Sequence, residues 1–474
     1  MKTMIGRLTA LASLSALASL PLGTAHGADA NDSRFLSLYK ELVETNTTLS
    51  SGSCTLAAER MRARLLQAGY TSGDVQILAP PNLPRSGDLI ATLPGSDLKL
   101  KPILLLAHID VVEAKAADWK RDPFKLVEDK GVYYARGSSD DKAMASSFTD
   151  AMIRYREEGF RPKRTIRLAL TCGEETSRET DGVAWLLSAH PDFLDAEFAL
   201  NEGAHGQYDE NGKPKTLEVQ AGEKVYTDFE LTLNDPGGHS SRPRYEGTAI
   251  VRMSQALAKL GAYEFPISIN DTTRRYFQTE ALHAAPDVAR DMRAILAALP
   301  DNEAAARLWR ANPSWNGMIR TTCVPTMISG GHADNALPQR VTVNVNCRIL
   351  PGTGNDEIQK TLTQVMDDPG ISVKIVDGSP SRPKLPPITD RILNPANQIA
   401  EAIWPGIVVL PTLSTGATDG SYLNSASTPT YGLSGMLAGP EGNNAHGLNE
   451  HIRKQSLLDG RRFLYEVVKL YAAQ

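Results

Sequence analysis

The sequence predicts an α/β protein with two domains, and three observations support this. The chain has 474 residues, more than a single hydrophobic core usually organises. In its first half, helix-prone segments alternate with apolar segments that suit strands covered on both faces, such as Leu104 to Ala107. From about Glu223 onward, apolar and polar residues alternate as they do in half-exposed strands. We therefore expect a second, α+β domain after the first set of strands.

The elements of the first domain follow from the same patterns. Helical periodicity over 33–70 fits two helices, and turn residues separate a strand at 87–93 from the one at 104–107. Further along we expect a strand at 131–137, a helix at 143–158, a strand at 165–172, a short strand within 197–203, and C-terminal helices at 394–403 and 454–472.

The second domain is expected at 222–384, between two parts of the first domain at 28–221 and 385–474. Its strands and helices are expected near 223–233, 247–261, 340–350, 355–366 and 371–376. This order predicts an α+β sandwich with helices on one face of a mostly antiparallel sheet. A helix-prone segment at about 263–316 has no strand signals, and we expect it to be a helical insertion.

The N-terminus predicts a secretory signal peptide over residues 1–27. Lys2 and Arg7 precede an apolar run at 8–22, and small residues follow it. A membrane anchor is the alternative, but it needs about 20 apolar residues, and this run is shorter and contains Ser and Pro21. We therefore expect a secreted or periplasmic protein without membrane attachment once the signal is cleaved.

Composition excludes some partners. A formal net charge of −5 with 22% charged residues gives no general attraction to nucleic acid or to anionic membranes. The four cysteines, Cys54, Cys172, Cys323 and Cys347, show no CxxC spacing and so do not form a zinc knuckle. Cys323 and Cys347 could pair or remain buried thiols, and Cys172 is expected to be a core residue on a strand.

Acidic and imidazole side chains stand where the predicted strands and one helix meet their loops. The candidates are His108, Asp140, Glu174, Glu175, Glu202 and, in a glycine-rich loop near the C-terminus, His446. A helix-capping role is an alternative for one of the aspartates at 140–141, but adjacent glutamates at a strand end repel each other unless a cation neutralises them. A mixture of imidazole and carboxylate suits zinc better than calcium, and two zinc ions would need a shared carboxylate.

These segments resemble the co-catalytic zinc hydrolases that include carboxypeptidase G, aminoacylase, acetylornithine deacetylase and vacuolar carboxypeptidase S. The resemblance runs through nearly the whole chain after the signal and is carried by the ordered motifs LLAHID, ARGSSDDK, TCGEE, LNEG, GGHSSRP and NNAHG. It implies a zinc-peptidase-like catalytic domain with a central mixed sheet flanked by helices, and an inserted α+β lid or dimerisation domain.

The resemblance also implies roles for the candidate residues. One zinc would be held by His108 and Glu202, and the other by Glu175 and His446. The remaining roles are Asp140 as the bridge between the ions, Asp110 as the partner that orients His108, and Glu174 as the general base. Cobalt or manganese could replace zinc. In relatives the peptide bond after the bridging aspartate is cis, so the bond between Asp140 and Asp141 is expected to be cis.

The second domain supplies three further candidates by the same resemblance. His239 would polarise the scissile carbonyl, often across a dimer interface, and Asn335 and Arg348 would grip the substrate carboxylate. A capping role for His239 and a salt bridge on a strand face for Arg348 are the alternatives. The insertion at 263–316 puts a homodimer in doubt, because it could cover the sheet edge or replace the partner's contribution.

The sequence thus predicts a zinc-dependent hydrolase of amide bonds next to a free carboxylate, either a carboxypeptidase or an N-acyl amino acid amidohydrolase. Its substrate would be a small peptide or an N-acyl amino acid. A dipeptidase of the same family is an alternative within the class. An exported binding protein that has lost catalysis is an alternative from another class, and the retained Glu174 argues against it.

Overall fold

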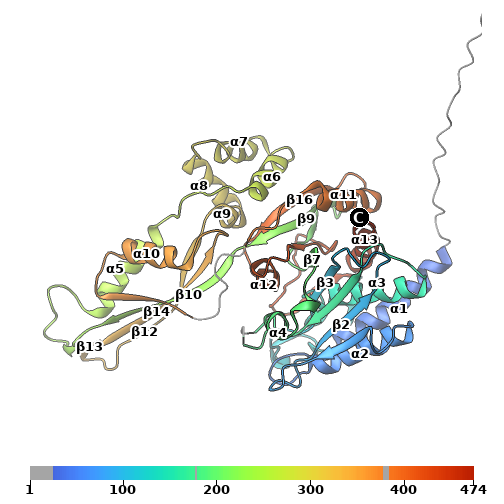
Figure 1. Cartoon of the computed structure of the whole chain (residues 1–474). Coiled ribbons are helices and arrows are strands. Elements are labelled where there is room, and N and C mark those ends of the chain that lie inside the picture. The colour runs from blue at the N-terminus through green and yellow to red at the C-terminus, as the bar shows by residue number, and fades with distance from the viewer. Residues whose placement is uncertain (1–24, 177–178, 377–383) are drawn as a thin grey trace, which may run out of the picture.

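The computed structural model describes residues 25–176, 179–376 and 384–474. Most of the predicted signal peptide therefore lies outside the described residues. Within the described part of the chain, none of the helices is long and apolar enough to cross a membrane. The chain forms a large mixed sheet with helices on both faces, a separate smaller sheet, and a group of short helices between them (Figure 1).

The large sheet has ten strands and confirms the predicted mixed α/β class. Its order is β1(Val75–Leu78), β2(Asp88–Leu93), β6(Ile166–Thr171), β3(Ile103–His108), β7(Phe198–Asn201), β17(Thr430–Gly432), β9(Pro214–Glu223), β8(Gly206–Tyr208) and β18(Leu437–Ala438), with β16(Val408–Ser414) paired to β9. Strands β6, β3 and β7 are parallel neighbours, so their carboxyl ends lie at one edge of the sheet.

Strand β3 is buried on both faces, as its apolar run predicts. Leu105 and Ala107 belong to the core shared with helices α1(Ala25–Val43), α2(Cys54–Gln67), α3(Lys142–Glu157), α11(Asp390–Ile403) and α13(Lys454–Ala472). Leu104 and Leu106 point the other way, into a smaller core with helices α4(Gly182–Ala189) and α12(Gly420–Ser425). Since successive side chains of a strand alternate between faces, a continuous apolar run is needed at such a central position.

A three-stranded sheet beside this domain consists of β4(Val127–Asp129), β5(Val132–Tyr134) and β19(His451–Arg453). Strand β5 pairs with β19, which joins the segment before α3 to the C-terminal segment that precedes α13. Two regions far apart in the sequence therefore meet next to the ends of the main strands.

The smaller sheet is antiparallel, in the order β12(Thr322–Gly330), β14(Arg340–Ile349), β10(Val225–Asn234) and β15(Ile371–Ile375). Helices α5(Ala249–Ala262) and α10(Asn355–Met366) pack on one face and share a core with it. The expected sandwich elements are confirmed. Strand β12 has no counterpart among the predicted elements. It is an edge strand whose Val324, Met327 and Ile328 are exposed, so its sequence carries no burial pattern.

The segment at 263–316 is helical, as predicted, and forms α6(Asp271–Glu280), α7(Pro286–Ile295), α8(Asn302–Ala311) and α9(Pro313–Ile319). These helices share a core with Val408 and Leu410 of β16, so they pack against the main sheet. The residues of β12 from Val324 onward remain exposed. The insertion therefore covers β16 and leaves the edge of the smaller sheet open (Figure 1).

All four cysteines form disulfides. Cys323 and Cys347 lie opposite each other in β12 and β14 and are bonded, which decides between the two alternatives that the sequence left open. Cys172 is buried as predicted, but it is also bonded to Cys54, 118 residues earlier. The sequence could not indicate this pairing, because it depends on how α2 packs beside the end of β6.

Replacing both Cys54 and Cys172 by serine should lower the free energy of unfolding by about 2–4 kcal/mol, because the bond restricts a long loop of the unfolded chain. The loop spans 118 residues, against 24 for the other bond. Urea denaturation followed by circular dichroism measures the change. The variant lacking Cys323 and Cys347 serves as the comparison, with a smaller expected loss. An unchanged denaturation midpoint in the first variant would contradict the prediction.

Candidate metal centre

The first group of candidate ligands surrounds the last residue of β3. His108 is buried, and its Nε2 lies 3.1 Å from Oδ1 of Asp140 and 3.8 Å from Oε1 of Glu202. One donor atom from each residue lies within 4.8 Å of the others. An imidazole and two carboxylates at this spacing form a set that could hold a metal ion.

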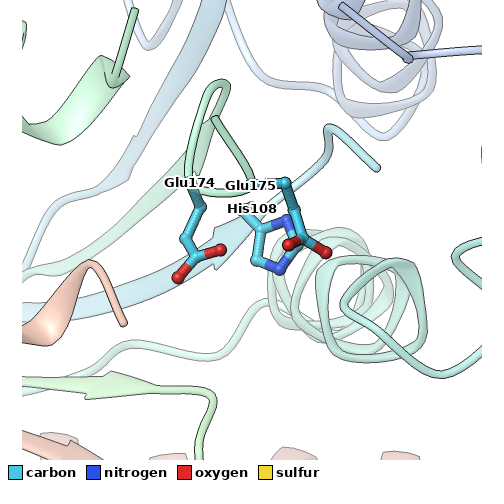
Figure 2. Close-up of side chains that lie close together, drawn as sticks. All are labelled: His108, Glu174 and Glu175. Carbon is cyan, nitrogen blue, oxygen red and sulfur yellow. The ribbon is translucent and has the colours of Figure 1, made fainter. Parts of the chain in front are cut away.

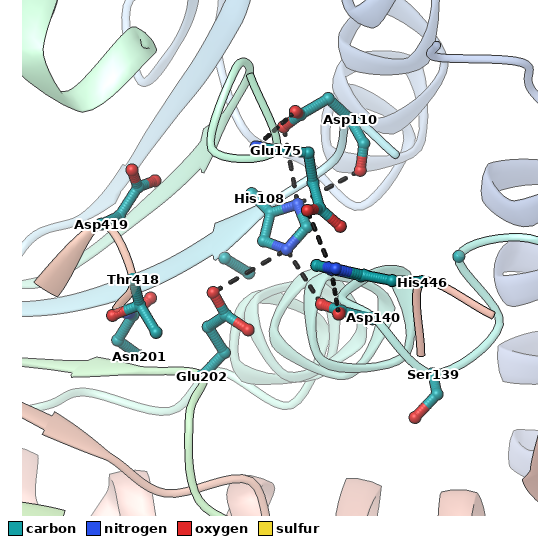
Figure 3. A network of polar contacts seen from close by, with 12 residues as sticks. His108, Asp110, Ser139, Asp140, Glu175, Asn201, Glu202, Thr418, Asp419 and His446 are labelled. Carbon is teal, nitrogen blue, oxygen red and sulfur yellow. Dashed lines mark hydrogen bonds and ion pairs between the residues drawn. The ribbon is translucent and has the colours of Figure 1, made fainter. Parts of the chain in front are cut away.

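A second group shares one residue with the first. Nε2 of His446 lies 2.9 Å from Oε2 of Glu175 and 3.3 Å from Oδ2 of Asp140. Asp140 therefore turns one oxygen toward each histidine, which is the arrangement a bridging carboxylate requires (Figure 3).

The strand order explains why these residues meet. His108 ends β3, Glu175 follows β6 and Glu202 follows β7, and these three neighbouring strands are parallel. Asp140 stands two residues before α3, and His446 lies in the loop between β18 and β19. The peptide bond between Asp140 and Asp141 is cis, as expected.

Asp110 contacts both His108 and Glu175. Its backbone carbonyl lies 3.1 Å from Nδ1 of His108, and its Oδ1 lies 3.5 Å from the same nitrogen. Its Oδ2 accepts a hydrogen bond from the backbone N–H of Glu175 at 3.0 Å. Because oxygen atoms face Nδ1, the arrangement favours a proton there and leaves Nε2 free toward the carboxylates.

Glu174 lies beside His108 but belongs to neither of the two groups that share Asp140. Figure 2 shows Glu174 and Glu175 flanking the ring of His108, and donor atoms of all three residues lie within 4.8 Å of one another. Burial raises the pKa of Glu174, and the charge of Glu202 raises it further. A carboxyl group with a raised pKa in such a place suits proton transfer.

The electrostatics of the cluster favour a cation. Hydrogen bonds to Asp140 and Glu175 raise the pKa of His446 to about 10. Burial would raise the pKa of Asp140, but hydrogen bonds to His108 and His446 lower it below its usual range. Five carboxylates, those of Asp110, Asp140, Glu174, Glu175 and Glu202, surround two imidazoles. This excess of negative charge at low exposure fits divalent cations, so the residues present fit a pair of metal ions.

Residues 418–419 form hydrogen bonds to residues at the ends of the strands next to the cluster. The Thr418 hydroxyl donates to Oε2 of Glu223 at 2.8 Å and accepts from Nδ2 of Asn201 at 3.0 Å. Asp419 accepts a hydrogen bond from the hydroxyl of Thr171 at 3.0 Å. These contacts tie the ends of β6, β7 and β9 together, so this loop supports the strand ends next to the candidate ligands.

The structure does not bring the three candidates of the second domain to this cluster. His239 lies in the exposed ribbon of β11(Gly238–His239) and β13(Ala336–Leu337), and its Nδ1 is 2.9 Å from the hydroxyl of Ser241. Asn335 is exposed in the same ribbon, which lies at the end of the small domain away from the main sheet (Figure 1). Arg348 stacks over the ring of Tyr226 at 4.6 Å.

Sequence reasoning missed two buried residues that contact the ligand loops. Arg136 and Glu450 form an ion pair at 2.7 Å, and their side chains are only 3% and 1% exposed. The signal was weak, because an arginine after a strand and an acid in a polar loop are usually solvated. Only their burial in the fold distinguishes them.

A mixed sheet whose parallel strand ends bring one histidine and several carboxylates together with the loop residues Asp140 and His446 has the architecture of an α/β metallohydrolase. Residues 104–470 match the Peptidase family M20/M25/M40, and the chain belongs to this family. It is accordingly a metal-dependent peptidase or amidohydrolase, which confirms the resemblance drawn from the motifs.

Individual relatives agree with this assignment. The N-fatty-acyl-amino acid synthase/hydrolase PM20D1 of Mus musculus is 26% identical over 391 residues, which cover 80% of this chain and 76% of that protein. The probable carboxypeptidase S-like 2 of Dictyostelium discoideum is 25% identical over 407 residues, covering 82% and 75%. Among solved structures, the M20 family metallo-carboxypeptidase Sso-CP2 of Sulfolobus solfataricus has a TM-score of 0.69 at 17% identity, covers 93% of this chain and 99% of its own, and shares the fold.

Removing divalent metal with a chelator should abolish amide hydrolysis, because the cluster holds more negative charge than its own histidines can balance. Adding zinc or cobalt should restore the activity. Hydrolysis of N-acyl amino acids before and after dialysis against chelator measures both steps. Full activity in a preparation shown to be metal-free by elemental analysis would contradict the prediction.

Proposed function

We propose that this protein is a secreted or periplasmic zinc-dependent hydrolase that cleaves an amide bond next to a free carboxylate. Its substrates would be N-acyl amino acids or the C-terminal bonds of small peptides. The observation that carries the proposal is Asp140, whose two oxygens lie 3.1 Å and 3.3 Å from the imidazoles of His108 and His446, with Glu174 close by. The names of the relatives support both substrate classes, and the N-terminal pattern supports export.

In this proposal His108 and Glu202 would hold one zinc ion, Glu175 and His446 would hold the other, and Asp140 would be the ligand that both ions share. When bound, the two ions supply Lewis acidity, which lowers the pKa of a water molecule and polarises the substrate carbonyl. Asp110 fixes the ring of His108, so that Nδ1 faces oxygen and Nε2 is left toward Asp140 and Glu202, where it would be available to a metal ion.

Glu174 is the proposed general base. Its carboxylate takes a proton from the attacking water and later gives that proton to the nitrogen of the leaving amine. Two nearby cations would offset the negative neighbours that raise its pKa. A single group can then act first as base and then as acid.

The substrate carboxylate would be bound by Arg348 and Asn335, and His239 would donate a hydrogen bond to the oxyanion. Arg348 lies half-buried over Tyr226 near the start of β10, close to where the chain crosses between the domains. His239 is on the exposed ribbon of β11 and β13, at the end of the small domain away from the main sheet, so its role requires either closure of the small domain or a second subunit.

The exposed edge of β12 favours a homodimer, in which a second subunit would supply His239. The open edge of β12 presents backbone groups and the exposed side chains of Val324, Met327 and Ile328, which suit pairing with another copy. The insertion packs on β16 and leaves this edge free. In this account residues 222–384 form the lid or dimerisation domain, and 28–221 with 385–474 form the catalytic domain, consistent with their separate cores.

Replacing Glu174 by glutamine should lower kcat by about 10²–10⁴-fold, the range for loss of a general base. Metal content, measured by elemental analysis, should remain that of the wild type, because Glu174 is outside the two proposed ligand sets. Glu113→Gln, which changes an exposed carboxylate in the loop after β3, is the matched control and should keep full activity. Near-normal turnover by the Glu174 variant would remove the proposed role.

Replacing Arg348 by alanine should raise KM for an N-acyl amino acid by about 10- to 100-fold, the usual cost of losing a hydrogen bond to a charged group. The corresponding carboxamide, which lacks the charge, should be affected little. Arg340→Ala, on the same strand, is the control. An equal loss on both substrates would contradict carboxylate recognition by Arg348. Hydrolysis confined to substrates with a free amine would instead indicate a dipeptidase.

A further inference from the structure

Glu450 is a buried carboxylate that accepts hydrogen bonds from the segment at 136–140, which leads to Asp140. Its Oε1 accepts from the backbone N–H groups of Ser139 at 2.9 Å and Asp140 at 3.0 Å. Its Oε2 accepts from the backbone N–H of Gly137 at 3.0 Å and from Nη1 of Arg136 at 2.7 Å. The carboxylate therefore holds three N–H groups of the segment that ends in Asp140.

Arg136 extends this contact to the other loop. Besides its bond to Glu450, its Nη2 donates to the carbonyl oxygens of Gly447 at 3.0 Å and of His446 at 3.4 Å. Its guanidinium also lies over the ring of Trp119, 5.1 Å from the centroid. One guanidinium thus binds both Glu450 and the backbone of the loop that carries His446.

The two loops need such a connection. His108 ends a strand of the main sheet, whereas Asp140 and His446 come from irregular segments. The side chain of His446 is 59% exposed, so packing alone does not hold it. Its backbone has a φ of 61°, a conformation that residues with a side chain rarely adopt unless their surroundings impose it.

We propose that Arg136 and Glu450 are a positioning pair that sets the distance between Asp140 and His446 and thereby determines the affinity of the ion bound by Glu175 and His446. The inference rests on the ligand assignment in the proposed function. The ion of His108 and Glu202 depends less on the pair, because His108 ends β3 and Glu202 directly follows β7.

The chemistry of the pair defines the test variants. In Glu450→Gln, the amide NH₂ group would replace an oxygen that accepts two hydrogen bonds, so donors would face donors and Arg136 would lose its counter-charge. In Arg136→Lys the charge is kept, but a single ammonium lacks the planar fork that reaches Glu450 and two carbonyls together. Both variants keep nearly the original volume.

The control is a second ion pair in the same C-terminal region. Arg453 donates to both oxygens of Glu441, at 2.7 and 2.8 Å, but these side chains are 32% and 43% exposed. Glu441→Gln makes the same chemical change as Glu450→Gln without contacting the segment at 137–140. Exposed pairs contribute little, so this variant should behave as the wild type does.

The experiment measures zinc binding by the full chain with a competing chromophoric chelator, which resolves the two ions by affinity. The wild type and Glu441→Gln should bind two zinc ions. Glu450→Gln and Arg136→Lys should bind the second ion about 10- to 100-fold more weakly, the usual effect of losing a partner that orients a metal ligand. The first ion should be weakened less than the second, because it shares only Asp140 with the disturbed loops. Excess zinc should restore their turnover, which a general folding defect would not allow.

Equal weakening of both ions, or wild-type affinity for both in the two variants, would overturn the inference. Arg136→Lys serves alone if Glu450→Gln does not fold, as judged by circular dichroism of the metal-free protein. Fewer than two zinc ions on the wild type would contradict the proposed function itself. Two ions on the wild type with unaltered variants would contradict only the positioning pair.

Discussion

Crowding of like charge at one edge of the main sheet is the constraint on which the rest of this protein depends. The parallel strands β3, β6 and β7 end side by side, and their last residues and following loops carry an imidazole and several carboxylates. Such a cluster is unfavourable without compensating cations, because buried carboxylates repel one another and lose hydration. The same arrangement becomes favourable when divalent cations bind. Relief of the repulsion between these carboxylates therefore contributes to the affinity for metal.

Precise placement of these ligands depends on contacts that bring distant segments together. Strand β19 pairs the C-terminal segment with β5. Glu450 accepts a hydrogen bond from the backbone N–H of Asp140. Asp110 contacts His108 and accepts a hydrogen bond from the backbone N–H of Glu175. The disulfide between Cys54 and Cys172 fixes the end of β6 just before the two glutamates. Catalytic geometry of this kind requires a supporting layer, since small displacements of a ligand weaken both binding and reaction.

The small domain stands apart from the metal cluster, and the helical insertion does not cover the exposed sheet edge at β12, although covering it was one of the two possibilities that the sequence left open. The insertion's core with β16 makes it part of the junction between the domains, while the sheet edge at β12 stays open. A site that combines ligands on one domain with His239 on the other requires relative movement or a second copy. The proposed role of His239 therefore depends on one of these two rearrangements.

Much of this was determined by the sequence. The apolar run at 104–107 predicted a strand that is buried on both faces, and the alternation after Glu223 predicted the second sheet. The ordered motifs identified the candidate ligands and the family. These inferences succeed because they depend on local periodicity and on short segments with fixed chemistry. The sequence could not predict strand β12, because its exposed apolar residues follow no burial pattern, or the cysteine pairing across α2 and β6. Only the tertiary structure decided the partners of Arg136 and Glu450, because contacts between remote segments leave no periodic signal in the chain. For the same reason, only the tertiary structure placed the ribbon of β11 and β13, which carries His239, at the end of the small domain away from the main sheet.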